Sequence, residues 1–410
     1  MTSKRVSLKV SPEAGLRVSF ARQPAFRELV DVAPLVVLGN ERVPALLSES
    51  IVPSASTCFG PRGACLTSAD GPLWICDTGH HRLLGWSKLP SSDQAPADWL
   101  IGQRDFSCEG RNGKGEIGPN TVNVPTGICA VEGGLAVADA WNHRILVWRQ
   151  IPRGSHVPAD IVLGQADFTT GLANRGADHP RAETLHWPYG VYYNNSRLFV
   201  ADTGNRRVLI WSKPLTENGQ KADLVLGQND FATRDENAGA DPSAMSMRWP
   251  HAITFWNDRF CVSDAGNNRI LVWGKCPEVS GASADGVIGQ SDTTNVDFNQ
   301  AFYWPRCNTL NMPYGITSSG DWLIVADTAN SRLLAWRDRS LDPAEPVETG
   351  TEGDASALFG QKDFHEKGDN RWQPAAADSL CWPYGVQAVD SMIVMADSGN
   401  NRVSIWKLAL

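Results

Sequence analysis

Short apolar runs separated by turn residues recur along the chain in groups of four. In each group one run follows a proline, a second precedes an aspartate, a third ends on a tryptophan and a fourth precedes Gly-Gln. The stretch "VADTGNRRVLIW" (200–211) shows the second and third runs joined by a polar turn. Runs of this length bounded by Gly, Pro, Asn and Asp are typical of β-strands. Each group is therefore predicted to be a small four-stranded sheet.

The group occurs six times with the same internal spacing. Successive aspartates are 62, 63, 62, 63 and 70 residues apart; an arginine follows each after five residues and a tryptophan after nine. The aspartates are Asp77, Asp139, Asp202, Asp264, Asp327 and Asp397, and the prolines are Pro61, Pro125, Pro188, Pro250, Pro313 and Pro383. Repeated four-stranded units are typical of propeller blades. The pattern predicts an all-β, six-bladed β-propeller.

The last group lacks its Gly-Gln run, and a spare copy, "PLVVLGN" (34–40), precedes the first proline. We expect this N-terminal strand to complete the C-terminal blade and close the ring. The predicted propeller spans 34–410, with blade cores at 61–103, 125–165, 188–228, 250–290, 313–361 and 383–408 plus 34–40. Residues 1–33 are predicted to be an N-terminal extension, a modestly basic outer flap or tail. The long fifth step reflects a polar insertion within 337–356, which we expect to be a solvated outer loop.

Residues that recur in all six groups serve what the blades share, which is structure. The aspartate can accept N–H groups of its turn, and a following Gly or Asn can supply a left-handed position. The arginine can bond that carboxylate or a carbonyl of the adjoining blade. The tryptophan is large enough to fill the wedge between blades.

The same residues carry a resemblance to a known family. Asp-x-x-Asn-x-Arg after an apolar strand, preceded by Pro-x-Gly, resembles the NHL repeat, and "DAWNHRILVW" (139–148) is similar to its consensus. Two groups depart from it, with His80 in place of Asn and Ala329 in place of Gly. The resemblance implies a propeller over about 34–408. Propellers of this kind bind proteins, bind RNA or sense ligands, and related lactonases and lyases hold a metal in the central channel.

Composition narrows the functional classes. The chain carries 37 basic and 45 acidic residues, a net charge of −8, which argues against a nucleic-acid partner or an anionic membrane surface. No apolar run approaches the length of a membrane span, and the N-terminus shows no secretory signal. Nine cysteines without a short-spaced pair indicate reduced thiols. A cytoplasmic protein is expected.

Candidate functional residues are those that differ between groups at equivalent positions. The innermost strand of a blade follows the proline, so residues beside the proline are expected at the mouth of the central channel, on the same face as long loops of 20 to 22 residues. The alternative is that these aromatic residues only plug the channel. The predicted ligand- or partner-binding residues are Arg62, His186, Trp187, Tyr189, Arg248, Trp249, His251, Tyr314, Cys381 and Tyr384.

A metal in the channel is the basis of a second hypothesis. A calcium site would need carboxylates, which the positions flanking the prolines lack, whereas His186, His251 and Cys381 are candidate ligands for a transition metal. No cofactor is firmly implied. The sequence thus predicts a non-catalytic propeller scaffold that binds a protein partner or a small ligand at its loop-rich face and channel mouth. The alternative is a metal-assisted lyase or hydrolase with its site in the channel.

Overall fold

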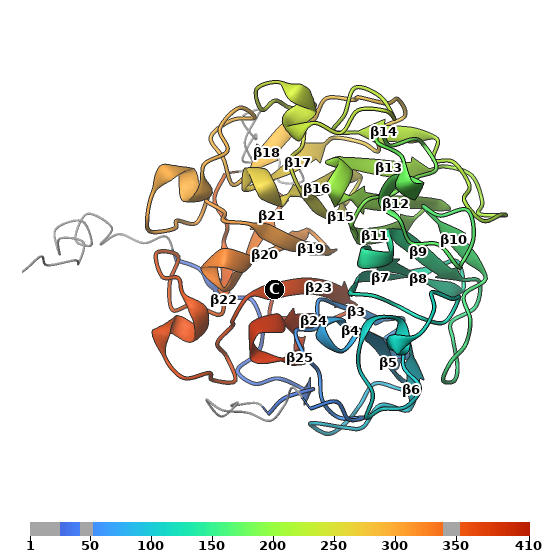
Figure 1. The fold of residues 1–410 in the computed structure, drawn as a ribbon. Coiled ribbons are helices and arrows are strands. Elements are labelled where there is room, and N and C mark those ends of the chain that lie inside the picture. Colours follow the sequence, from blue (N-terminus) through green and yellow to red (C-terminus); the bar gives the residue numbers. More distant parts are fainter. Residues whose placement is uncertain (1–24, 42–51, 339–352) are drawn as a thin grey trace, which may run out of the picture.

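Six small sheets surround a central axis in the computed structural model, which describes residues 25–41, 52–338 and 353–410 (Figure 1). Within each blade the strands run antiparallel, and the strand that follows the repeated proline is innermost. The six inner strands, β3, β7, β11, β15, β19 and β23, contact one another around the axis. This confirms the predicted all-β, six-bladed propeller.

The strands of each blade lie where the repeat predicts them. Blades one to three are β3 (Gly63–Leu66), β4 (Leu73–Asp77), β5 (Arg82–Trp86) and β6 (Trp99–Ile101); β7 (Pro125–Val131), β8 (Gly134–Asp139), β9 (Arg144–Trp148) and β10 (Ile161–Leu163); and β11 (Pro188–Asn194), β12 (Arg197–Asp202), β13 (Arg207–Trp211) and β14 (Leu224–Leu226). Blades four to six are β15 (Pro250–Trp256), β16 (Arg259–Asp264), β17 (Arg269–Trp273) and β18 (Gly286–Ile288); β19 (Pro313–Ser319), β20 (Trp322–Asp327), β21 (Arg332–Arg337) and β22 (Ala357–Phe359); and β23 (Pro383–Val389), β24 (Met392–Asp397), β25 (Arg402–Lys407) and β2 (Val36–Leu38).

All described helices are 3-10 turns of three or four residues, and none of them could cross a membrane. One set joins the second and third strands of each blade: η1 (Thr78–His80), η3 (Ala140–Asn142), η5 (Thr203–Asn205), η7 (Ala265–Asn267), η9 (Thr328–Asn330) and η11 (Ser398–Asn400). The other set lies in the long loops between blades: η2 (Arg111–Lys114), η4 (Ala173–Gly176), η6 (Glu236–Gly239), η8 (Phe298–Ala301) and η10 (Asp369–Trp372).

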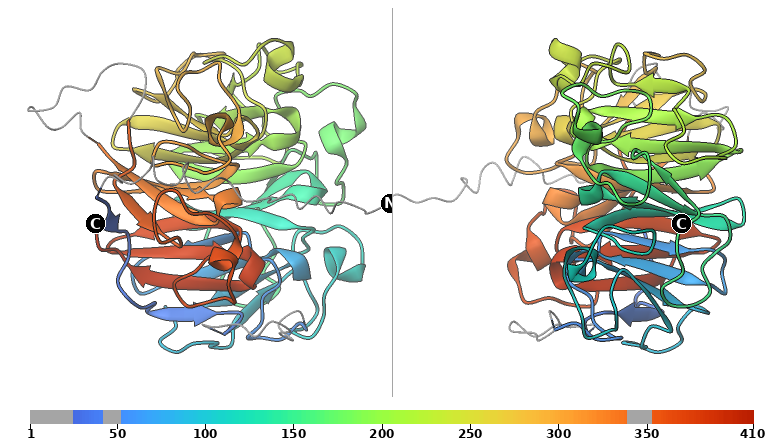
Figure 2. Two further views of the ribbon diagram at one scale, coloured as in Figure 1. Left: turned by 90° about the vertical axis from the view of Figure 1, so that its left-hand side faces the viewer. Right: turned by 45° about the vertical axis from the view of Figure 1, so that its right-hand side comes forward.

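The N-terminal strand closes the ring as predicted. Strand β2 pairs with β25 of blade six, with Val36 opposite Ile405 and Leu38 opposite Val403, and Figure 2 shows it in blue beside the red strands. A second N-terminal strand, β1 (Arg27–Glu28), adds a parallel fifth strand to blade five on β22. Part of the predicted extension therefore lies on the outer edge of the propeller. Residues 1–24, and residues 339–352 of the predicted insertion, lie outside the described residues.

The hydrophobic core consists of six clusters, each shared by two neighbouring blades. Each cluster contains one of the repeated tryptophans, in order Trp86, Trp148, Trp211, Trp273, Trp336 and Trp406. Every one of these indole N–H groups donates a hydrogen bond, at 2.9–3.2 Å. A satisfied polar tip allows the whole ring system to be buried, so the predicted role of the tryptophan as an interblade wedge is confirmed.

The repeated aspartate and arginine form a buried network that ties the loops to each blade. In blade three, Asp202 Oδ2 accepts hydrogen bonds from Arg207 Nε at 2.8 Å and from Asn205 Nδ2 at 2.8 Å. Asp202 Oδ1 accepts the backbone N–H of His186 at 2.7 Å, and the remaining arginine nitrogens donate to three loop carbonyls. The expectation that the aspartate accepts backbone N–H groups of its own turn is therefore wrong: the turn contributes the Asn205 side chain, and the backbone donor comes from the loop before the inner strand.

The left-handed residue is also not the Gly or Asn two or three residues after the aspartate, and it is an Asn in only two of the six blades. It lies four residues after the aspartate, with φ between +51° and +57°, at His81, His143, Arg206, Asn268, Ser331 and Asn401. The 3-10 helix occupies the three positions between. In blade three the glycine two residues after the aspartate gives space, since a Cβ on Gly204 would lie 2.6 Å from the carbonyl oxygen of His186, whereas blades two and five have Trp141 and Ala329 at this position.

Candidate functional site

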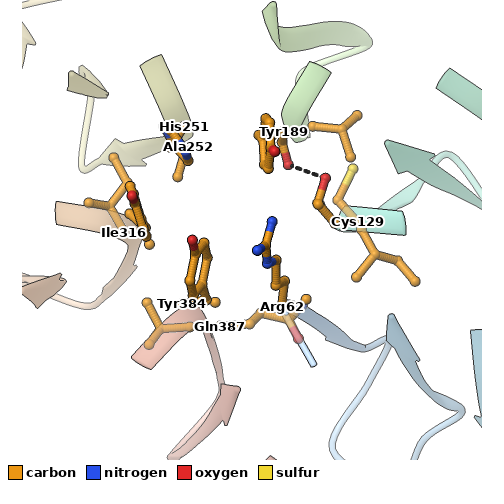
Figure 3. A pocket seen from close by; sticks show the side chains of 18 of the residues that line it. Arg62, Cys129, Tyr189, His251, Ala252, Ile316, Tyr384 and Gln387 are labelled. Carbon is orange, nitrogen blue, oxygen red and sulfur yellow. Dashed lines mark hydrogen bonds between the residues drawn. The ribbon is translucent and has the colours of Figure 1, made fainter. Parts of the chain in front are cut away.

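The first side chain after each repeated proline points into the central channel. These residues are Arg62, Thr126, Tyr189, His251, Tyr314 and Tyr384, and all six line the channel cavity. Ring centroids lie 5.0 Å apart for Tyr189 and His251, 4.3 Å for His251 and Tyr314, and 4.4 Å for Tyr314 and Tyr384. The Arg62 guanidinium closes the circle, 4.6 Å from the Tyr384 ring and 5.8 Å from the Tyr189 ring (Figure 3). Aromatic side chains and one cation thus form a packed collar across the channel.

Burial holds the collar in a neutral state apart from its arginine. Burial, reinforced by the charge of Arg62, lowers the pKa of His251 to about 4. His251 Nδ1 lies 2.9 Å from the Trp249 carbonyl oxygen, which only accepts, so Nδ1 carries the proton. Burial also raises the pKa of Tyr314 and Tyr384 above that of an exposed tyrosine. At neutral pH the collar presents one positive charge among uncharged rings.

The collar separates two spaces. The channel cavity below it, between the inner strands, has a volume of about 150 Å³. The mouth cavity on the loop side has a volume of about 570 Å³ and uses five collar residues as its floor: Arg62, Tyr189, His251, Tyr314 and Tyr384. Its walls are His186, Trp187, Thr203, Gly204, Arg206, Arg234, Asp235, Glu236 and Trp249. His186 and Trp187 directly precede the inner strand of blade three, and the other wall residues belong to blade three or to the loop between blades three and four, so the cavity is off-centre.

The junction between blades three and four differs from the other five. At those five, the left-handed turn residue of one blade accepts the backbone N–H of the residue before the next blade's proline, at 2.8–3.3 Å. Asn268, for example, accepts from Met312 at 2.8 Å. Arg206 has no acceptor to offer. Its side chain instead lines the mouth cavity, where Nη1 donates to the Arg234 carbonyl at 3.1 Å.

The comparisons with known proteins agree with this architecture. A family model described as the NHL repeat matches residues 123–148, which run from the loop before β7 to the last residue of β9. The chain is a six-bladed β-propeller that contains an NHL repeat. No curated protein matches its sequence significantly.

Several solved structures resemble this propeller at low identity. Kuenenia stuttgartiensis hydrazine synthase has 11% identity and a TM-score of 0.49, with 89% of this chain and 99% of that chain covered. A streptogramin B lyase has 11% identity and a TM-score of 0.43, with coverage of 87% and 95%. A chain of a nidogen/laminin complex has 15% identity and a TM-score of 0.37, with coverage of 73% and 83%. Such likeness concerns the fold alone.

Eight of the ten predicted binding residues line the mouth cavity of the propeller. The exceptions are Arg248 and Cys381, which precede their prolines by two residues and lie over the turn glycines Gly266 and Gly399. Arg248 forms an ion pair with Glu236, Nε to Oε1, at 3.0 Å. Burial raises the pKa of Cys381 to about 12, so its thiol stays protonated.

The three candidate metal ligands do not come together. His186 and His251 both line the mouth cavity, whereas Cys381 belongs to blade six and does not. Among the described residues, no three His, Cys, Asp or Glu side chains are grouped as a metal site would require. Burial lowers the pKa of His186, and its Nδ1 is buried without a hydrogen-bond partner.

Sequence reasoning missed the charged wall of the cavity. Arg206 lies four residues after the repeated aspartate, in a turn that the sequence analysis interpreted as structural. Arg234, Asp235 and Glu236 lie in a loop whose sequence does not repeat between blades. A signal for Arg206 was present: the residues at the equivalent position of the other blades are His, Asn or Ser, and every one of those can accept a hydrogen bond.

Proposed function

We propose that this propeller is a binding protein that takes a small ligand into the mouth cavity without acting on it chemically. One observation carries the proposal. At the junction that forms the cavity, the left-handed turn residue does not accept the N–H of the residue before the next proline, as it does at the other five junctions. That turn residue, Arg206, lines the cavity instead. The volume of about 570 Å³ is within the usual range for small-molecule sites, and the lining combines aromatic surface with a few polar groups.

The lining supports binding more than catalysis. Catalytic sites usually pair a nucleophile with a hydrogen-bonded base that a third group orients. Among the described residues of the cavity no such pair is found: the Thr203 hydroxyl, for example, donates to the Pro250 carbonyl. His251 is held neutral with its Nδ1 proton on a carbonyl oxygen.

A protein partner on the same face is the second candidate. Five aromatic side chains near the channel mouth are 37–44% exposed: Phe59, Trp141, Trp187, Trp249 and Trp382. Exposed aromatic residues are enriched at protein interfaces. In this function the mouth cavity would receive one anchoring side chain of the partner.

A ligand screen tests the proposal. Thermal unfolding of the purified protein is followed with a chemically diverse set of small molecules, because a ligand that binds only the folded state raises the melting temperature. Trp249→Ala removes a cavity wall, and Trp141→Ala removes an equally exposed tryptophan outside the cavity as a matched control. We expect hits that stabilise the wild type and Trp141→Ala but not Trp249→Ala. Hits that are indifferent to Trp249 would place binding elsewhere.

Metal analysis of the same preparation addresses the enzyme alternative. A stoichiometric metal that is lost in both His186→Ala and His251→Ala would favour the metal-assisted reaction over simple binding.

A further inference from the structure

The mouth cavity is lined by positively charged side chains that have no carboxylate partners among the described residues. Three guanidinium groups, those of Arg62, Arg206 and Arg234, line it, and within the described part of the chain none of them forms an ion pair with a carboxylate. Of the two acidic wall residues, Glu236 is paired with Arg248 at 3.0 Å, outside the cavity lining. Asp235 is solvent-exposed. All three side chains are half-buried, and an anion in the cavity would stabilise such partly buried cations.

The arginines differ from the buried arginines of the repeat. Arg207, next in the chain to Arg206, is fully buried and has hydrogen-bond partners for each of its three nitrogens. Arg206 Nη1 donates hydrogen bonds to the carbonyl oxygens of Gly204 and Arg234, whereas its buried Nε has no hydrogen-bond partner. A donor left unsatisfied at the wall of a cavity is available to a ligand that brings an acceptor.

The two cavity histidines respond to the same positive potential. Burial lowers the pKa of His186 most; the negative charge of Asp202 opposes this, and the charges of Arg234 and Arg206 lower the pKa further. After burial, the charge of Arg62 lowers the pKa of His251. The potential therefore extends over both the wall and the floor of the cavity.

Most of the remaining lining consists of planar rings. Trp187 and Trp249 are 44% and 38% exposed, and the floor presents Tyr189, Tyr314 and Tyr384. Exposed indole and phenol faces bind flat unsaturated groups by stacking, with ring centroids 4.5–7 Å apart. The cavity thus offers two complementary surfaces, one cationic and one aromatic.

We propose that the ligand of this cavity is a small molecule that joins an anionic head group, carboxylate or phosphate, to a planar aromatic ring. The inference rests on the proposed binding function and specifies its ligand class. The head group is held by the guanidinium groups of Arg206 and Arg234, and the ring lies against the tryptophans. The positive charge of Arg62 at the floor attracts a carboxylate and a phosphate alike.

Isothermal titration calorimetry with probes that share one ring tests this class. The probes are 2-naphthoate, 2-naphthyl phosphate, 2-naphthol and 2-naphthylmethylamine, with acetate as an anion that lacks the ring. We expect at least one anionic naphthyl probe to bind at least tenfold more tightly than 2-naphthol, and its affinity to fall with added salt. The amine and acetate should not bind measurably. The ratio of naphthoate to naphthyl phosphate affinity distinguishes the two head groups.

Two substitutions separate the contributions. Arg234→Gln should weaken binding of the anionic probe about tenfold and leave 2-naphthol unchanged, whereas Trp249→Ala should weaken both. The control is Arg111→Gln, because Arg111 lies outside the cavity and its guanidinium is 5.5 Å from the exposed Trp141 ring. Arg111→Gln should bind as the wild type does.

The outcomes distinguish this inference from the proposed function. Binding of 2-naphthol or the amine as tightly as the anions, or no effect of Arg234→Gln, overturns the anionic class; if such binding is still lost in Trp249→Ala, the cavity remains a ligand site. Absence of binding by every probe also overturns the class. The broader ligand screen then decides whether the cavity binds anything.

Discussion

Restoring the missing interblade hydrogen bond should stabilise the propeller and damage its binding site. Arg206 has φ +57°, a left-handed conformation that Asn adopts more readily than Arg. At equivalent turns, Asn268 and Asn401 use the side-chain oxygen to accept the backbone N–H of the next blade at 2.8 Å. In Arg206→Asn, the Trp249 N–H would gain such an acceptor once Trp249 adopts the left-handed conformation of its equivalents in the other blades. Its present bond, to Asp264 Oδ1, is long at 3.3 Å.

The magnitude follows from these contacts. One added hydrogen bond contributes about 0.5–1.5 kcal/mol. Relief of left-handed strain at an ordinary residue adds up to about 1 kcal/mol. Loss of the Arg206 bonds to the Gly204 and Arg234 carbonyl oxygens subtracts about 0.5 kcal/mol, since both bonds are only part-buried. The left-handed conformation that Trp249 must adopt costs about as much as the strain relieved at position 206, so the net expectation is that the free energy of unfolding rises by about 0–1 kcal/mol.

Equilibrium unfolding in guanidinium chloride measures this change, and titration with a ligand of the mouth cavity measures the loss of affinity. The reciprocal variant, Asn268→Arg, is the control: it removes the acceptor of the Met312 N–H and should lower stability by about 1–3 kcal/mol. Arg206→Asn would refute the reasoning if it destabilised the protein by 1 kcal/mol or more, because Arg206 would then be a structural residue.

Three further variants test other parts of the molecule. Asp202→Ala leaves Arg207 buried without its carboxylate and should lower the free energy of unfolding by about 3–5 kcal/mol, measured by denaturant unfolding; a change below 1 kcal/mol would contradict the network. Leu38→Ala opens a cavity in the closing strand and should cost about 2–5 kcal/mol, against less than about 0.5 kcal/mol for exposed Val32→Ala; equal effects would argue against closure by β2. Burial lowers the pKa of His143 to about 4, below its unfolded value, so its contribution to stability is lost as pH falls from about 6.5 to 4. His143→Asn keeps an acceptor there and should remove about 1–2 kcal/mol of that pH dependence, after allowance for partial exposure of the ring, in melts across this range.

The fold could be predicted from the sequence because its main contacts repeat. A buried Asp–Arg pair and an interblade tryptophan are needed at every junction, so both recur at fixed spacing. Closure could be predicted for the same reason, since "PLVVLGN" is a copy of a run that the last blade lacks. The Asn40 amide donates to the Asn400 carbonyl, as the Gln103 amide does to the carbonyl of His80 in blade one.

Details inside the turn could not be predicted, because they depend on contacts between distant segments. The partner of Asp202 Oδ1 is a backbone N–H 16 residues upstream, and spacing along the chain does not reveal it. Likewise, His186, Arg248 and Cys381 each stand two residues before a repeated proline, but only His186 lines the cavity.

The junction between blades three and four departs from the other five junctions at three positions, which are Arg206, Trp249 and Ala252. The residue before the proline is left-handed in the other five blades, with φ between +47° and +56°, but Trp249 is not. A left-handed Trp249 would aim its N–H at Arg206, which cannot accept it. Two residues after Pro250, blade four has Ala252, whereas the other five blades have glycine at the equivalent position. At one of these glycines, Gly190, a Cβ would lie 2.0 Å from the His251 carbonyl oxygen. The inner strand of blade four therefore tolerates a side chain where its neighbours do not. A repeat protein gives up such regular contacts chiefly where function requires a different arrangement, so variants that alter ligand specificity should cluster at this junction.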